Sequence, residues 1–294
     1  MNRFLERLNA GEILVSDGAT GSNLQKMGLK PGQPPEDLII DSPDLISGLA
    51  ASFVEAGSDI ILTCTFGGTR MRMKDSKYQE RTSEVNMLAA ELARKAASKR
   101  TDVLVAGSMG PVGALIKPYG SLEAEDVRAT FAEQAKALAD GGVDLLVIET
   151  MFSFEETTAA FEGARSATDL PIVISFSYDR GTRSMMGVKP KDVIKRYTEM
   201  GVTMVGANCG TTLENMEAVA KEYVDTVPNA PLWVKPNAGV PRMDIQTEQG
   251  IYDMSPQDMA RFSKKYVALG ARVVGGCCGN TPEHVAAIVK AVKN

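Results

Sequence analysis

The chain has 294 residues, of which 44% are hydrophobic and 23% are charged, and its net charge is -5 at pH 7. This balance is typical of a globular chain that buries a large core, and it excludes an intrinsically disordered one. Lysine and arginine form no stripe interleaved with aromatic residues, so we expect neither nucleic acid nor an anionic membrane surface as a partner. Small molecules and other proteins are the expected partners.

The N-terminal segment carries Arg3, Glu6, Arg7 and Glu12, where a signal peptide would need an unbroken apolar stretch. No later segment reaches the ~18 consecutive apolar residues that a membrane-spanning helix needs. We therefore expect a cytoplasmic protein in which the four cysteines are reduced. In that compartment cysteines are more often metal ligands or catalytic groups than partners in structural disulfides.

Short apolar runs rich in β-branched residues recur along the chain and alternate with segments of helical periodicity. The runs predict strands at 13–19, 59–66, 102–110, 144–151, 171–178, 203–210, 231–239 and 271–279. The intervening segments, such as 83–98 and 255–270, predict amphipathic helices, several of which end at glycine. Eight strand-helix units with continuously apolar strands predict that residues 1–294 form a single-domain α/β fold, the (β/α)8 TIM barrel. A doubly wound open sheet is the alternative.

Two longer connections, 20–43 and 240–254, both follow predicted strands and are rich in glycine, proline and polar residues. Connections of this kind carry functional groups more often than they link domains. We therefore expect both to be loops over the active face of the barrel.

Polar residues end most of the predicted strands, and in a barrel the functional side chains come from these carboxyl ends. The residues are Asp17, Thr63, Thr65, Ser108, Glu149, Asn208, Cys209, Asn237, Cys277 and Cys278. Because the sixth and eighth strands flank the seventh, Cys209 is expected to come within reach of Cys277 and Cys278. Neighbouring residues of a flat strand point to opposite faces, so the vicinal pair needs a bend, which the surrounding glycines permit.

Three cysteine thiolates favour Zn²⁺, and three protein ligands with an open fourth position are typical of a catalytic zinc site. His284 is the only histidine in the chain, which excludes a Cys₂His₂ site. The fourth cysteine, Cys64, is expected to be a small buried core residue.

A zinc ion with three thiolates has a net charge of about -1 and is a poor activator of water. It is better suited to binding a fourth, exogenous thiol and keeping that sulfur deprotonated and nucleophilic. The expected reaction is therefore attack by a substrate thiolate on an electrophilic carbon, most simply a methyl group. Two other functions remain open: a Schiff-base lyase or aldolase using Lys235, and a non-catalytic zinc- or redox-sensing module.

Several segments resemble the zinc-dependent homocysteine S-methyltransferases, and particularly the homocysteine-binding barrel of cobalamin-dependent methionine synthase. They are "SDGATGSNLQKMG", "TCTFGGTRMRM", "GSMGPVG", "VIET", "GANCG", "KPNAG" and "GGCCGNTPEH", which occur in this order over almost the whole chain. Cys64 and Thr69 stand where relatives often carry asparagine.

The resemblance implies a (β/α)8 barrel in which Cys209, Cys277 and Cys278 are the catalytic zinc ligands and the homocysteine sulfur is the fourth ligand. It also implies that Asp17, Gly18 and Glu149 hold the ammonium and backbone end of the amino acid, with Asn237 near the metal. The substrate carboxylate needs N–H or hydroxyl donors, which Thr63, Thr65 and the turn starting at Gly18 can supply.

A chain of this length has no room for the folate and corrinoid modules of the multidomain enzyme, so the methyl group is expected to come from outside. A separate methylated corrinoid protein carrying methylcobalamin is the favoured donor. S-methylmethionine or a betaine, the donors of other stand-alone relatives, are the alternatives.

Overall fold

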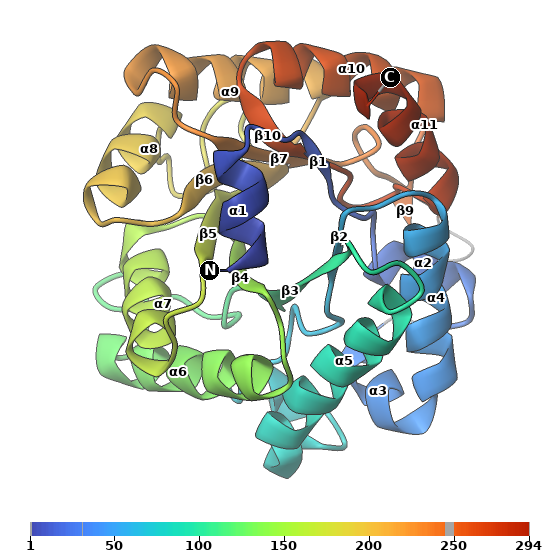
Figure 1. The fold of residues 1–294 in the computed structure, drawn as a ribbon. Helices are drawn as coiled ribbons and strands as arrows, with labels where there is room; N and C mark the ends of the chain where they lie inside the picture. Colours follow the sequence, from blue (N-terminus) through green and yellow to red (C-terminus); the bar gives the residue numbers. More distant parts are fainter. Residues whose placement is uncertain (1, 31, 245–249, 294) are drawn as a thin grey trace.

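The computed structural model describes residues 2–30, 32–244 and 250–293. Eight parallel strands are joined edge to edge in the order β1-β10-β7-β6-β5-β4-β3-β2. The first and last of this order are linked by a parallel bridge between Ser16 and Ile60, which closes the sheet into a barrel (Figure 1). The barrel prediction is confirmed and the open-sheet alternative is wrong. The strands are β1 (Leu14–Val15), β2 (Ile60–Leu62), β3 (Leu104–Met109), β4 (Leu145–Met151), β5 (Ile172–Phe176), β6 (Met204–Cys209), β7 (Leu232–Pro236) and β10 (Ala271–Val274).

A helix follows each barrel strand and packs against the outside of the barrel (Figure 1). These helices are α4 (Pro43–Glu55), α5 (Thr82–Ala97), α6 (Ala124–Asp140), α7 (Phe154–Ala167), α8 (Pro190–Glu199), α9 (Leu213–Thr226), α10 (Pro256–Ala268) and α11 (Pro282–Lys293). The helix predicted at 255–270 has a recognisable sequence signal at each end. Ser255 and Asp258 form a capping box at its start, and Gly270 adopts a φ of +113° just past its end. In the described part of the chain, no helix combines the length and apolar character needed to cross a bilayer.

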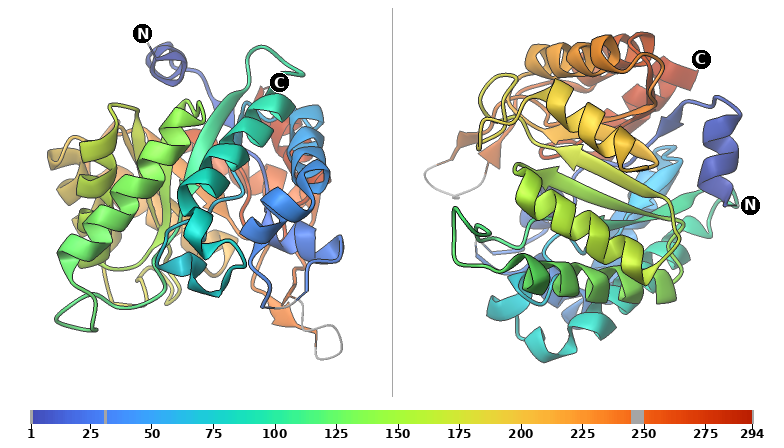
Figure 2. Two further views of the ribbon diagram at one scale, coloured as in Figure 1. Left: turned by 90° about the horizontal axis from the view of Figure 1, so that it is seen from below. Right: turned by 90° about the vertical axis from the view of Figure 1, so that its left-hand side faces the viewer.

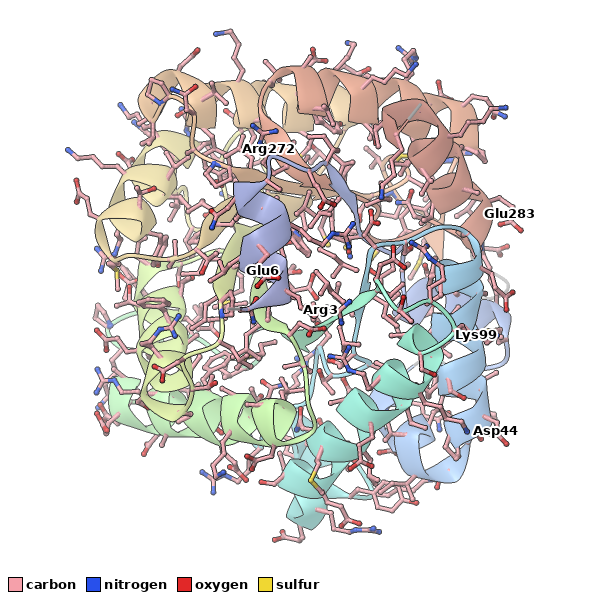
Figure 3. The ribbon with its side chains drawn as sticks, viewed as in Figure 1. Arg3, Glu6, Asp44, Lys99, Arg272 and Glu283 are labelled. Atoms are coloured by element: carbon pink, nitrogen blue, oxygen red, sulfur yellow. The ribbon has the colours of Figure 1, made fainter. Side chains whose placement is uncertain are left out.

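The N-terminal helix α1 (Arg3–Asn9) lies across the amino end of the barrel, where Figure 3 shows its Arg3 and Glu6 in front of the strands. Phe4 on its inner face is fully buried and packs with Leu14, Trp233 and other residues of the barrel interior. Asn2 caps this helix by accepting hydrogen bonds from the N–H groups of the next turn. The amino end is thus closed by an apolar plug, and only the carboxyl end is left for a site.

The strands are shorter than we predicted from the apolar runs. The polar and glycine residues at the carboxyl end of each run fall outside the regular hydrogen-bond ladder of the sheet. β1 stops at Val15 and β10 at Val274. The chain beyond β10 is nevertheless tied down, since the N–H groups of Gly275 and Gly276 donate to Val234 and Asp17.

The two long connections contain more regular structure than expected. Residues 20–43 fold into α2 (Gly21–Lys26), the 3₁₀ turn η1 (Pro35–Asp37) and α3 (Leu38–Asp41), because Leu24, Leu38 and Ile39 join the core. A third connection, between β2 and α5, also contains regular structure, the 3₁₀ turns η2 (Arg72–Asp75) and η3 (Gln79–Arg81). Within 240–254, β8 (Arg242–Met243) pairs antiparallel with β9 (Gly250–Ile251), and residues 245–249 lie outside the described residues. Figure 2 shows this hairpin on the side of the barrel opposite α1.

Candidate metal centre and adjoining carboxylates

The three cysteines predicted from strands six and eight come together at the carboxyl end of the barrel. The Sγ atoms of Cys209, Cys277 and Cys278 all lie within 4.8 Å of one another. The closest pair is Cys209 and Cys277, with 2.9 Å between their sulfurs. The fourth cysteine, Cys64, is buried in the core as expected.

Local backbone geometry turns these sulfurs toward a common point. Cys209 is the last residue of β6 and has a φ of +56°, which a side-chain-bearing residue rarely adopts. Cys277 and Cys278 lie in the turn after β10, which is held to β7 by the Cys277 N–H donating to Pro236. Gly276 is required in this turn, because a Cβ there would lie 2.2 Å from the side chain of Asn280.

Asn208 supports the cluster from inside the barrel. Its Nδ2 donates to the Thr150 hydroxyl at 2.7 Å and lies 3.5 Å from Cys209 Sγ and 3.8 Å from Cys277 Sγ. Its Oδ1 accepts from the Thr150 N–H at 2.9 Å and from the Ser175 hydroxyl at 2.6 Å. One fully buried amide therefore fixes the ends of β4, β5 and β6 around the sulfurs.

The chemistry of this donor set fits a zinc ion. In a tetrahedral zinc site with zinc–sulfur bonds of about 2.3 Å, the sulfurs lie about 3.8 Å apart. The three sulfurs of this cluster lie between 2.9 Å and 4.8 Å apart, a range that includes this spacing. Asn237, which follows β7, has a buried Oδ1 with no hydrogen-bond partner among the described residues, while its Nδ2 donates to Gly210 at 3.3 Å. A buried acceptor without a partner is uncommon, and a ligand bound beside the cluster would supply one to Asn237.

Asp17 and Lys235 form a buried ion pair beside this cluster. Lys235 Nζ donates to Asp17 Oδ1 at 2.7 Å, and the other carboxylate oxygen accepts from the Leu62 N–H at 2.7 Å. Burial opposes the charge on Lys235, but Asp17 and Glu149 outweigh it, and the pKa of the Lys235 ammonium is raised. The carboxylate of Asp17 is thus already partnered by the protein, and Lys235 is held as a cation.

Glu149 is the second carboxylate at this end of the barrel. It lies in β4, and its Oε1 accepts from the Ser108 hydroxyl at 2.5 Å. Burial raises the pKa of Glu149 to about 7, although the charge of Lys235 opposes the shift. Its negative charge is only partly compensated within the chain, so a cationic ligand at this position would stabilise the ionised form.

Thr63 and Thr65 face the interior, where their hydroxyls are 2.6 Å apart. Thr63 Oγ1 accepts from the Ser108 N–H at 3.0 Å, and Thr65 Oγ1 donates to the Ser108 carbonyl at 2.7 Å. Both threonines therefore hold Ser108, the residue that donates to Glu149. Gly18 has a packing role, because a Cβ there would lie 2.6 Å from the Asn280 carbonyl oxygen.

Several residues of the site carried no clear signal in the sequence. Thr150 follows Glu149 within the predicted strand, and its φ of +62° reverses the side-chain alternation that the strand pattern implied. Tyr252, in the connection between β7 and α10, packs its ring against Gly279, the residue after Cys278. Asn280 is fully buried, and its Nδ2 donates to Pro236 at 3.1 Å. The short "CCGN" spacing at the end of β10 is a signal that could have indicated Asn280.

Comparison with known proteins identifies the family and the fold that the chain resembles. The sequence profile of the family described as homocysteine S-methyltransferase matches residues 14–292. A methionine synthase of Mycobacterium leprae (strain TN) is 28% identical over 305 residues, which cover 98% of this chain and 25% of that protein. The chain thus spans about a quarter of the length of this curated relative.

Solved structures give the same match over whole chains. The metallated form of the homocysteine methyltransferase MmuM from Escherichia coli superimposes with a TM-score of 0.83 at 25% identity, covering 100% of both chains. The apo form of the same protein gives a TM-score of 0.76 at 26% identity, covering 99% of this chain and 100% of the other.

Proposed function

Because the chain belongs to the homocysteine S-methyltransferase family, we propose that it transfers a methyl group to the sulfur of homocysteine and forms methionine. We further propose that the reaction depends on zinc bound by Cys209, Cys277 and Cys278. The observation that carries this proposal is the meeting of three thiols from two distant segments at the open end of the barrel. MmuM, which resembles the chain throughout, has been solved in a metallated form.

Bound zinc would keep the homocysteine sulfur deprotonated, and therefore nucleophilic, at neutral pH. Asn208 holds Cys209 and Cys277 in place from below, so the substrate sulfur approaches from the open carboxyl face. That sulfur attacks the methyl carbon, and the new sulfur–carbon bond forms as the bond between the methyl group and its donor breaks. The electron pair of the broken bond leaves with the donor, and the proton of the homocysteine thiol passes to solvent.

Glu149 is the proposed ligand of the homocysteine ammonium group. An ammonium ion near its carboxylate supplies the positive charge that the chain itself does not fully provide, and a charge-assisted hydrogen bond orients the amino acid. Ser108, held by Thr63 and Thr65, fixes the carboxylate for this contact. Asp17 contributes more indirectly, by holding Lys235 beside Glu149, and the turn at Gly18 is proposed to lie along the amino acid backbone.

We propose a methylated corrinoid protein as the methyl donor. Every exposed large hydrophobic side chain of the described residues lies in a connection that leaves the carboxyl ends of the strands. They are Met27, Phe66, Leu115, Tyr119, Met185, Met186, Val240, Met243 and Ile251. Exposed apolar side chains gathered on one face, several of them adaptable methionines, are typical of surfaces that bind another protein. A small donor such as S-methylmethionine would need no such surface.

The Schiff-base alternative has little support, because a nucleophilic lysine must be neutral and Lys235 is buried as a cation against Asp17. The sensor alternative leaves the buried carboxylate of Glu149 without a role.

The test combines metal analysis with a donor screen. Reduced, unchelated protein is analysed for zinc and is then assayed for methionine formation from homocysteine. The donors are a methylated corrinoid protein, free methylcobalamin, S-methylmethionine and betaine. We expect about one zinc per chain and the fastest turnover with the corrinoid protein. Metal-free protein with full activity would overturn the zinc mechanism, and turnover with S-methylmethionine alone would overturn the donor proposal.

A further inference from the structure

The two neighbouring cysteines of the metal cluster lie in a tight turn. Residues 277–280 form a β-turn that is closed by the Asn280 N–H donating to the Cys277 carbonyl at 3.2 Å. Its third residue, Gly279, has a φ of +81°, which a type II turn requires at this position. The Sγ atoms of Cys277 and Cys278 both belong to the cluster, so the shape of this turn decides whether the two sulfurs can face one ion.

The side chain of Asn280, the last residue of the turn, folds back over it. Its Nδ2 donates to the Cys277 carbonyl at 3.1 Å and lies 3.5 Å from the Cys278 carbonyl oxygen. It also donates to the Pro236 carbonyl at 3.1 Å. Because three carbonyl oxygens surround this atom, only the NH₂ group of the amide can face them, and the orientation of the amide is fixed. The side chain is fully buried and lies over Gly276, where a Cβ would come within 2.2 Å of it.

The contact with Pro236 ties the turn to the third cysteine. Pro236 is the last residue of β7 and is paired with Cys209 in the parallel ladder between β6 and β7. One amide group therefore holds the two neighbouring cysteines against the residue that lies opposite Cys209. The main chain of Asn280 is held as well, because its carbonyl accepts from the Ala19 N–H at 3.1 Å and from Asn23 Nδ2 at 2.9 Å.

Asn280 contributes to this region through its Nδ2 alone. Its Oδ1 is buried and has no hydrogen-bond partner among the described residues, which is unfavourable. The three carbonyls that Nδ2 contacts also accept from the backbone N–H groups of Cys277, Ala238 and Asn280 itself. Removing the amide therefore leaves none of these carbonyls unpaired. Its loss should change the position of the sulfurs more than the stability of the fold.

We propose that Asn280 is a positioning residue of the metal centre, which holds Cys277 and Cys278 in the arrangement that lets both sulfurs bind one ion together with Cys209. The inference rests on the proposed function, since it takes the three cysteines as the zinc ligands. Residues that orient metal ligands without touching the metal typically contribute about 10- to 100-fold to metal affinity.

The test compares metal binding by the wild type and by Asn280→Asp, which keeps the shape of the side chain and replaces its donor by an acceptor. Zinc affinity is measured by competition with a chromophoric chelator, and Co²⁺ is then bound in place of zinc as a spectroscopic probe. We expect the zinc affinity to fall about 10- to 100-fold. The thiolate-to-cobalt charge-transfer absorption should weaken, because one sulfur of the neighbouring pair no longer reaches the ion. Asn280→Ala, which removes the donor without adding a charge, should give the same changes.

Asn23→Asp is the matched control. Asn23 is a buried residue of α2 whose Nδ2 donates to the Ala19 carbonyl at 2.6 Å and to the Asn280 carbonyl at 2.9 Å. Among the described residues, its hydrogen bonds reach the same turn but neither of the cysteines in it. We expect this variant to keep the zinc affinity and the cobalt spectrum of the wild type. Circular dichroism and melting temperature are measured for all three variants.

Wild-type affinity and spectrum in the two Asn280 variants would overturn the proposal. An equal loss of affinity in Asn23→Asp would also overturn it, by showing that the metal depends on the turn as a whole and not on this amide. Unfolding of both Asn280 variants would do the same, because the residue would then serve the fold. A wild type that bound neither zinc nor Co²⁺ would overturn the zinc mechanism together with this inference, whereas a metal-binding wild type matched by its Asn280 variants would overturn the inference alone.

Discussion

Asp59 and Glu156 are both buried carboxylates, but they lie at opposite ends of the barrel and have very different partners. Asp59, at the amino end, accepts from Arg7 and Lys293 and from the Val15 N–H at 2.7 Å. Glu156, near the carboxyl end, accepts from the Val112 N–H at 2.7 Å, and burial raises its pKa to about 7. The buried charge of Asp59 is therefore neutralised by cations of the chain, whereas no ion pair among the described residues neutralises Glu156.

The backbone shows the same contrast. Thr150 and Cys209, at the carboxyl ends of β4 and β6, have φ angles of +62° and +56°. At the amino end, the comparable residue is Asn229, with a φ of +65°, and asparagine tolerates this region far better than β-branched threonine does. In barrels of this type the amino end serves stability and the carboxyl end serves function. Strain and uncompensated charge are concentrated at the end where a ligand can offset them.

The largest effect we predict comes from breaking the metal cluster. Cys209→Ala should lose bound zinc and lower methyl transfer by at least about a thousandfold, because the metal supplies several kcal/mol of stabilisation to the reacting sulfur. The fold should persist, since Cys209 lies outside the barrel's apolar layers. Zinc analysis, turnover assays and circular dichroism check the three parts of this prediction.

Cys64→Ala is the matched control for that variant. Cys64 is buried in the core and is absent from the metal cluster. Its replacement should leave zinc content and turnover unchanged and cost about 1 kcal/mol of stability through lost packing. If Cys209→Ala and Cys64→Ala behaved alike, the division between the sulfur cluster and the core would be wrong.

The next largest effect should come from the amino end. Asp59→Ala removes the carboxylate that neutralises Arg7 and Lys293 and leaves the Val15 N–H without its acceptor. We expect a loss of about 3–4 kcal/mol in unfolding free energy, measured by urea denaturation. Zinc content and turnover of the folded protein should be retained. Asp102→Ala, at an exposed pair with Arg100, should cost less than about 1 kcal/mol. A loss of zinc in Asp59→Ala would contradict the separation of the two ends.

Glu149→Gln tests the carboxylate proposed to bind the substrate ammonium. The variant should raise the KM for homocysteine by about 10- to 100-fold, which is the cost of replacing a hydrogen bond to a charged acceptor by a neutral one. Zinc should be retained, because Glu149 is not among the clustered sulfurs. Steady-state kinetics in homocysteine give the answer, and an unchanged KM would remove Glu149 from the substrate site.

The barrel can be predicted from the sequence because apolar residues recur with a regular period in both the strands and the helices. Eight apolar runs separated by amphipathic segments encode which residues face the interior and which face the helices, and the polar residues that end the runs identify the carboxyl end. The meeting of Cys209 with Cys277 follows from strand order alone. Periodicity carries no information about contacts between chain segments that leave the ladder.

Asp17 and Lys235 illustrate that limit. They are 218 positions apart in the sequence, and each had a separate interpretation, the first as an ammonium ligand and the second as a possible nucleophile. In the folded chain they neutralise each other, which changes the expected role of both. Tyr252 was missed for a similar reason, because its contact with Gly279, beside Cys278, depends on the path of a loop rather than on a strand pattern.

The smallest effect, and the one that tests the comparison most directly, concerns Glu156 itself. Its pKa in the folded protein, about 7, lies above the value of about 4.5 expected in the unfolded chain, because burial disfavours the charged form. Folding therefore favours the protonated acid. This contribution to stability is fully present below about pH 4.5 and is lost as the pH rises through about 7.

Glu156→Gln should remove that pH dependence. The amide keeps an oxygen that can accept from the Val112 N–H, but it carries no charge to desolvate at high pH. The variant should therefore match the wild type at about pH 5 and exceed it by about 2 kcal/mol at about pH 8.5. Urea denaturation at both pH values measures the difference, and contributions from other titrating groups, such as Glu149, cancel between the two proteins. If instead the variant lost stability at about pH 8.5, Glu156 would be as well compensated as Asp59, and the contrast between the two ends would not hold for buried charge.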